Sequence, residues 1–141
     1  MNTHYHKQLT LRNRVEELTR VEAFLEELAT EWDLPVKLIL NLNLALEEAV
    51  TNIMFYGYVD EEVHTILIDF TRQDDLLTIS IMDDGHAYDP TARPDPDITL
   101  AAEDRPIGGL GIFLIKKIMD QVEYERKENK NYLTLNKRIE Q

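Results

Sequence analysis

Two strand-like runs near the middle of the chain constrain its fold most strongly. They cover Thr65 to Arg72 and Leu76 to Met82, and only the polar turn Gln73-Asp74-Asp75 separates them. Short runs of alternating apolar and polar residues, bounded by turn residues, predict two consecutive β-strands. Because such strands bury one apolar face of a sheet, another layer of the molecule must cover that face.

Helical patterns before and after these strands predict the covering layer. Apolar residues recur at helical spacing in three segments, which we expect to be helices: Asn13 to Trp32, Val36 to Tyr56 and Ile112 to Met119. Three more strands are expected: an edge strand from Lys7 to Leu11, and a closing hairpin of Val122 to Arg126 and Tyr132 to Lys137 around Glu128-Asn129-Lys130-Asn131. The order of these elements predicts an α+β two-layer sandwich, with a mixed β-sheet and helices on one face.

Composition narrows the class of protein. The 141 residues, 43% of them hydrophobic, fit one folded domain over residues 1 to 141. The absence of cysteine excludes disulfides, a thiolate nucleophile and Cys-based zinc sites. A net charge of −12 argues against binding to nucleic acid, whose phosphates are bound mainly through Lys and Arg. With no signal-peptide pattern and no apolar run that could span a membrane, we expect a cytoplasmic protein.

Asp83 is the most informative polar residue. Leu77, Ile79 and Ile81 share one face of their strand, and counting by twos places Asp83 on the same face. A carboxylate in a buried stripe is costly unless it is hydrogen-bonded or paired. Two interpretations stay open: a strand-end aspartate that caps the next turn, or an acceptor for an adenine amino group, with Gly85 allowing close approach of the ligand.

Glu48 and Asn52 lie one turn apart in the helix predicted from Val36 to Tyr56. At about 100° per residue, both fall at one edge of its apolar stripe, whereas Glu47 points toward solvent. A carboxylate and a carboxamide so placed can serve a Mg²⁺ shell and orient a hydroxyl group. Taken in isolation, an ordinary polar helix border is the better explanation of the pair.

A glycine-rich turn, Gly108-Gly109-Leu110-Gly111, precedes the last predicted helix. Backbone N–H groups at a helix N-terminus favour anions such as phosphate, although glycines also form ordinary turns. No G-x-x-x-x-G-K-[ST] motif occurs, which excludes a P-loop enzyme. The segment between Gly85 and Gly108 is too long for a plain connection, so we expect a lid or binding loop, in which Arg93 and Arg105 are candidate phosphate contacts or solvated arginines.

Three stretches, LALEEAVTNIMFYGY, IMDDGHAYDP and GGLGIFLIKKIMDQVEYER, together with the tail NYLTLNKR, carry a resemblance to a known family. They resemble the GHKL ATPase superfamily, also called the Bergerat ATP-binding fold, and more closely the bacterial anti-sigma-factor serine/threonine kinases. The resemblance runs from Leu9 to Lys137. It is carried by the joint order of the stretches, since each stretch alone is ambiguous.

The resemblance implies a role for each matched residue. Glu48 would be the general base, Asn52 a Mg²⁺ ligand, and Asp83 the acceptor for the adenine amino group. Further cofactor-binding positions would be Gly85, Thr134 on the strand beside the adenine, and the phosphate turn of Gly108, Gly109, Leu110 and Gly111. An ATP lid is expected at about residues 86–107. Tyr56 stands where the family often has a basic residue or histidine, which leaves one phosphate contact open.

The same resemblance implies a function. It predicts an ATP- and Mg²⁺-dependent serine/threonine protein kinase that regulates transcription by phosphorylating a STAS-domain antagonist. A sigma factor would be a second partner, and the kinase would be a homodimer with neither nucleic acid nor membrane among its partners. The alternatives are a non-catalytic, nucleotide-gated protein-binding module and an α/β protein without a nucleotide site.

Overall fold

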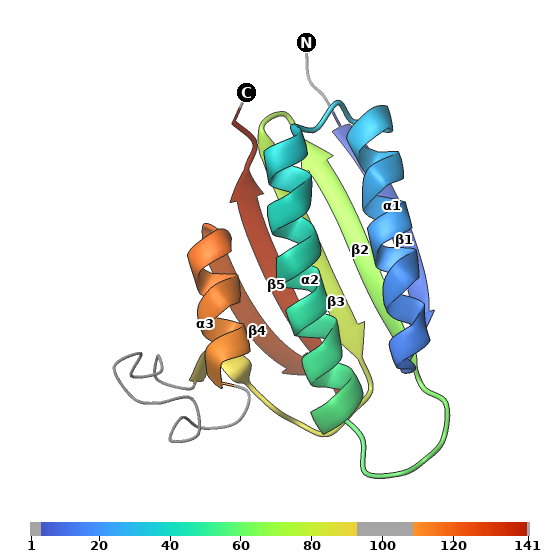
Figure 1. Cartoon of the computed structure of the whole chain (residues 1–141). Coiled ribbons are helices and arrows are strands. Elements are labelled where there is room, and N and C mark those ends of the chain that lie inside the picture. The colour runs from blue at the N-terminus through green and yellow to red at the C-terminus, as the bar shows by residue number, and fades with distance from the viewer. Residues whose placement is uncertain (1–3, 93–108, 141) are drawn as a thin grey trace.

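The computed structural model describes residues 4–92 and 109–140, which form a sheet covered by helices on one face (Figure 1). The five strands are β1 (His4–Arg12), β2 (Thr65–Gln73), β3 (Leu76–Asp83), β4 (Gln121–Lys127) and β5 (Lys130–Arg138). Their spatial order is β1-β2-β3-β5-β4, with β1 and β4 at the edges. All four neighbouring pairs are antiparallel, so the expectation of a mixed sheet is wrong. The cause is the crossover after β3, which takes the chain to the far edge before β5 returns between β3 and β4.

The helical layer consists of α1 (Leu18–Glu31), α2 (Val36–Tyr56) and α3 (Gly109–Ile118), with short 3₁₀ turns at Val15–Glu17 and Pro90–Ala92. All three helices lie on the same side of the sheet (Figure 1). The predicted bounds of α2 are confirmed at both ends. The two-layer α+β sandwich is confirmed as well.

The first helix begins later than the sequence pattern predicts. Asn13 was expected to be helical, but its N–H donates to the carbonyl of His64 at 3.0 Å. Its side chain Oδ1 accepts the N–H of His64 at 2.7 Å. Asn13 therefore extends the β1–β2 pairing by one residue, and regular helix starts only after the 3₁₀ turn. Glu17, which ends that turn, is buried and accepts the N–H of Arg12 at 2.9 Å.

The hydrophobic core fills the space between the sheet and the helices. Its largest fully buried side chains include those of Phe70, Ile66, Ile68, Leu77, Ile79 and Ile81 from the sheet. The alternation in β2 and β3 thus places every second residue against the helices. Among the described helices, α2 is the one long and apolar enough to cross a membrane, but its buried stripe of Leu38, Leu42, Ala45, Leu46, Ala49 and Val50 packs into this core.

Both ends of the described chain lie beside the β2–β3 turn. His4, the first residue of β1, pairs with Gln73. The N–H of Ile139 donates to the carbonyl of Asp75 at 2.6 Å. Asp83 lies at the opposite end of β3, and Figure 1 shows the N and C labels together at the end of the sheet where β2 and β3 are joined.

Candidate nucleotide-binding site

A pocket of about 520 Å³ opens between the C-terminal half of α2, the start of α3 and the strand ends of β3 and β5. This volume includes space at the mouth that is open to solvent. Its walls are mostly apolar, and polar groups enter at Asn52, Asp83 and Asn131. The lining residues are Ala49, Asn52, Ile53, Tyr56, Gly57, Asp83, His86, Tyr88, Pro90, Ile112, Ile115, Tyr124, Asn131 and Leu133.

Asp83 is buried at the end of β3, with 4% of its surface exposed. Burial raises the pKa of its carboxyl group, because desolvation disfavours the charged form. Two donors act against this: the N–H of Gly85 at 2.8 Å and Asn131 Nδ2 at 3.0 Å, both to Oδ1. Among the described residues no hydrogen bond reaches Oδ2. Within the described part of the chain, the carboxylate of Asp83 thus has one oxygen without a hydrogen-bond partner, and the residue lines the pocket.

Asn131 was missed by the sequence analysis, which placed it in a four-residue turn. The chain turns instead through two residues, Glu128 and Asn129, both in the left-handed region with φ of 53° and 62°. Such a two-residue turn is common in hairpins. It makes Asn131 the second residue of β5, directly opposite Asp83. A two-residue turn at Glu128-Asn129 would have started the last strand at Lys130 and so predicted Asn131 as a strand residue.

Gly85 lies where two backbone segments touch. A Cβ on Gly85 would stand 2.3 Å from the carbonyl oxygen of Gly57, so no larger residue fits without moving backbone. The N–H of His86 donates to the same carbonyl at 3.0 Å. Gly57 has φ of −81°, so it ends α2 without a left-handed turn. These two glycines join the end of α2 to the end of β3 at the floor of the pocket.

Glu48 and Gly111 lie close to Asn52, which lines the pocket. A Cβ on Gly111 would stand 3.0 Å from Glu48 Oε2 and 3.3 Å from Asn52 Nδ2. Glu48 and Asn52 are half-buried on α2, whereas Glu47 is exposed, as expected. Gly109 and Gly111 lie inside the first turn of α3, so the expectation that the helix starts at Ile112 is wrong. The N–H groups of a first helical turn have no partners within the helix, which leaves them free for an anion.

Some expected residues lie elsewhere. Thr134 pairs with Ser80 and Glu123 on the sheet face away from the helices, because its neighbours in β5 are buried under them. The structure therefore does not bring Thr134 to the pocket, and Asn131 faces Asp83 instead. Gly108 and residues 93–107 of the expected lid, with Arg93 and Arg105, lie outside the described residues, as does the side chain of Leu110.

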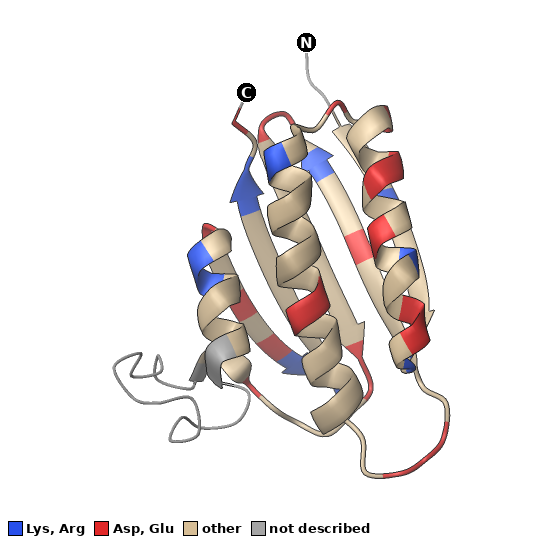
Figure 2. Ribbon diagram, in the orientation of Figure 1, with Lys and Arg blue, Asp and Glu red and all other residues tan. Residues whose placement is uncertain are grey.

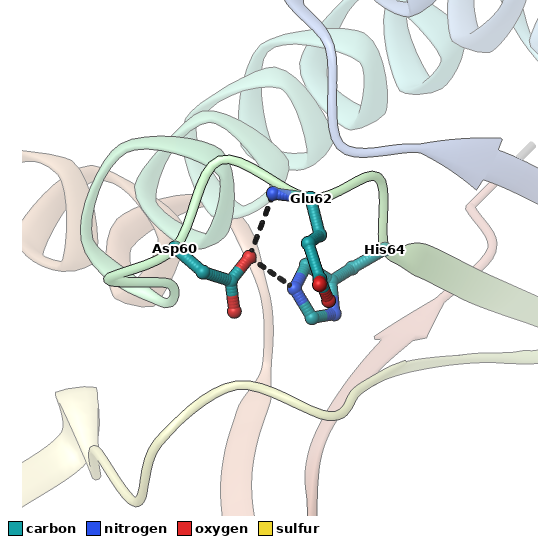
Figure 3. Close-up of side chains that lie close together, drawn as sticks. All are labelled: Asp60, Glu62 and His64. Carbon is teal, nitrogen blue, oxygen red and sulfur yellow. Dashed lines mark hydrogen bonds and ion pairs between the residues drawn. The ribbon is translucent and has the colours of Figure 1, made fainter.

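The loop after α2 carries a separate cluster of ionisable side chains, Asp60, Glu62 and His64 (Figure 3). Asp60 Oδ1 accepts the N–H of Glu62 at 2.9 Å and lies 2.7 Å from His64 Nε2. Asp60 raises the pKa of His64 through this contact. His64 also stacks on Tyr58, with ring centroids 4.1 Å apart. These contacts order the loop that leads from Gly57 to β2.

Comparison with known families gives a match over almost the whole chain. The sequence model of the histidine kinase-like ATPase domain matches residues 11–137. Among curated relatives, the serine/threonine-protein kinase BtrW of Bordetella bronchiseptica is 29% identical over 89% of this chain and 90% of its own length. The serine-protein kinase RsbW of Listeria monocytogenes is 34% identical, over 58% of this chain and 55% of its own length. The chain thus spans about half the length of that relative and nearly all of BtrW.

The fold also matches a solved structure. A crystal structure of the RsbU and RsbW domains of a Mycobacterium tuberculosis protein superposes with a TM-score of 0.69, covering 96% of this chain and 32% of that one. At 17% identity, this similarity concerns the fold.

Proposed function

Because the chain belongs to the histidine kinase-like ATPase family, we propose that it binds Mg·ATP and transfers the γ-phosphoryl group to a serine or threonine of a partner protein. The observation that carries the proposal is that Glu48 and Gly111 lie beside Asn52, which lines the same pocket as Asp83. The curated relatives named above are serine or serine/threonine-protein kinases, which supports the same activity.

The base end of the pocket suits adenine. The carboxylate of the buried residue Asp83 can accept a hydrogen bond, and an adenine amino group can donate one. Apolar side chains such as Ile53, Ile112 and Leu133 line the space beside it, where a planar ring can be enclosed.

Binding of the phosphate groups must overcome repulsion between their negative charge and that of the protein. The protein has a net charge of −12, and acidic residues lie along α1 and the loop after α2 (Figure 2). The first turn of α3 offers N–H groups to the phosphates, and the missing side chain at Gly111 leaves room for them. Asn52 and Glu48 carry the oxygen donors that Mg²⁺ prefers, so a Mg²⁺ ion fits here through Asn52. When bound, Mg²⁺ would neutralise charge on the phosphate oxygens.

We assign Glu48 the role of general base. Its carboxylate would take the proton of the attacking hydroxyl as the new O–P bond forms and the bond to the β-phosphate oxygen breaks, which leaves ADP. Catalysis would come mostly from positioning and charge neutralisation. As partners we propose a STAS-domain antagonist as substrate and a sigma factor as a competing ligand, with the kinase acting as a cytoplasmic homodimer. The alternative is a nucleotide-gated module that binds a partner without phosphorylating it.

Glu48→Ala tests the catalytic role. We expect nucleotide affinity to change little and phosphoryl transfer to fall about 100-fold or more, the usual contribution of a general base. Transfer is measured with labelled ATP and a STAS-domain protein encoded beside this chain, and ATP affinity by calorimetry. The matched control is Glu47→Ala, which removes the adjacent carboxylate on the exposed side of α2.

Equal transfer by the Glu48→Ala and Glu47→Ala proteins would refute the assignment of the base. If the unmodified protein binds ATP and the partner but transfers no phosphate, the non-catalytic module replaces the kinase.

A further inference from the structure

Asp83 belongs to a chain of polar side chains that extends from β3 across β5 to β4. Asn131 donates from Nδ2 to Asp83 Oδ1 at 3.0 Å and to the carbonyl of His86 at 2.9 Å. Its own Oδ1 accepts from the hydroxyl of Tyr124 at 2.5 Å and from Arg126 Nη1 at 3.1 Å. Asn131 is itself buried, its bond to Asp83 is buried, and its bonds to His86, Tyr124 and Arg126 are partly buried.

These contacts fix which way the amide of Asn131 points. Arg126 can only donate, so the atom facing it must be the amide oxygen. The NH₂ group is thereby turned toward two acceptors, the carboxylate of Asp83 and the backbone carbonyl of His86. A flipped amide would place donor against donor on one side and acceptor against acceptor on the other. Arg126 adds a second restraint by donating to the carbonyl of Gly85 at 2.7 Å.

The charge state of Asp83 decides which base the pocket can accept. As a carboxylate it accepts from an adenine amino group and repels the carbonyl oxygen that guanine carries at the same place. As a neutral acid it can donate to that oxygen. Burial and the nearby carboxylate of Asp84 favour the neutral acid, and the hydrogen bonds from Asn131 and Gly85 together with the charge of Arg126 favour the carboxylate. The phenol of Tyr58 also lies within electrostatic range of Asp83.

We propose that Asn131, oriented by Tyr124 and Arg126, is a positioning residue that keeps Asp83 an acceptor and so makes the pocket select adenine over guanine. The proposal rests on the proposed nucleotide site. Asn131 occupies Oδ1 of Asp83 together with the N–H of Gly85, which directs the remaining oxygen to the base.

Asn131→Leu removes the donor while keeping a side chain of similar size. We expect its affinity for ATP at pH 7 to fall about 10-fold, the usual effect of losing one hydrogen bond to a charged group. The ratio of ATP to GTP affinity should fall as well. The pH below which ATP binding weakens should move upward, because Asp83 then takes up a proton more readily. Calorimetric titrations with ATP and GTP between pH 5.5 and 8.5 measure all three quantities.

Two further variants make the test decisive. Arg126→Met keeps an aliphatic side chain but removes one restraint on the amide, so it should shift selectivity and the pH profile in the same direction by a smaller factor. It replaces Asn131→Leu as the deciding variant if that protein does not fold. Asn129→Gly, in the exposed turn where a left-handed φ suits glycine, is the control and should match the unmodified protein.

A loss of ATP and GTP affinity by the same factor at every pH, with the profile unmoved, would show that Asn131 is only structural and would overturn the inference. Unchanged selectivity in both variants would overturn it as well. Failure of the proposed function looks different, since the unmodified protein would then bind neither nucleotide.

Discussion

At the scale of single residues, burial of the charged Asp83 side chain lowers the stability of the fold at neutral pH, while the same side chain is proposed to bind the ligand. A carboxyl group whose pKa is raised in the folded state favours folding at pH values below its ordinary pKa. That contribution is lost as the pH rises through the folded-state value. At neutral pH the enclosed charge is therefore a cost, which its hydrogen bonds offset only in part. Such costs are typical of residues that are kept for what they bind.

Asp83→Asn removes the charge and keeps an oxygen that can accept from Gly85. We expect the free energy of unfolding at pH 7 to be unchanged or higher. Stabilisation by Mg·ATP should be lost, because the amide then turns its NH₂ group, a donor, toward the adenine amino group. At pH 4 the difference in stability between the two proteins should shrink. Urea unfolding at both pH values, with and without Mg·ATP, measures these effects.

Asp84→Asn is the matched control, since Asp84 is half exposed beside the site, and it should still respond to ATP. An Asp83→Asn protein that gains as much stability from Mg·ATP as the unmodified one would contradict the assignment of the base end.

The same residues show what the sequence could predict about the site. Counting by twos along β3 correctly predicted the burial of Asp83, because a strand has a fixed period. Asn131 escaped because its position depends on turn length, and a change of turn by two residues moves a residue from loop to strand. Thr134 was assigned through the resemblance, and strand phase alone would have placed it on the opposite face from Asn131 and Leu133.

At the scale of elements, α2 was the most predictable segment and α3 one of the least. The apolar stripe of α2 predicted its range from Val36 to Tyr56, because the helical periodicity extends over 21 residues. For α3, glycines were expected to stay outside the helix, since glycine disfavours helix interiors. Contact with Glu48 and Asn52 gives a reason for Gly111 inside it: any side chain there would occupy the space beside them.

Gly111→Ala separates stability from activity. Alanine is the better helix former by about 1 kcal/mol, so we expect unchanged or higher thermal stability. Its Cβ would stand 3.0 Å from Glu48 Oε2 and displace that carboxylate. Phosphoryl transfer should fall at least about 10-fold, because small misplacements of a catalytic group are costly. Single-turnover transfer and a melting curve give both quantities.

Lys117→Ala, on the exposed part of the same helix, controls for general effects on α3. A Gly111→Ala protein that transfers phosphate at the original rate would show that the close contact has no catalytic consequence.

At the scale of the whole molecule, the order of elements was enough to predict two layers, because helices and strands are segregated along the chain. The order of elements did not predict that all neighbouring strands would be antiparallel. The path after β3 passes through residues 93–108 and α3 before reaching β4, and no local pattern states at which edge of the sheet it arrives. The pocket forms where α2, α3, β3 and β5 meet, so ligand binding joins parts of the chain that are far apart in sequence.

This arrangement predicts global stabilisation by ligand. Mg·ATP at about a hundred times its dissociation constant should add roughly 2.7 kcal/mol to the free energy of unfolding. For a domain of this size the melting temperature should rise on the order of 5–10 °C. Thermal unfolding with and without Mg·ATP, with GTP as comparison, provides the measurement. No shift at any ATP concentration would rule out the nucleotide site.

The pairing of His4 with Gln73 and the bond from Ile139 to Asp75 put both ends of the described chain at the β2–β3 turn, a full strand length from Asp83. Reporter groups, affinity tags or a fused protein can thus be attached at either terminus without obstructing nucleotide entry. A donor and acceptor fluorophore joined to the two termini would start close together and report on integrity of the fold, while leaving the site open to substrate.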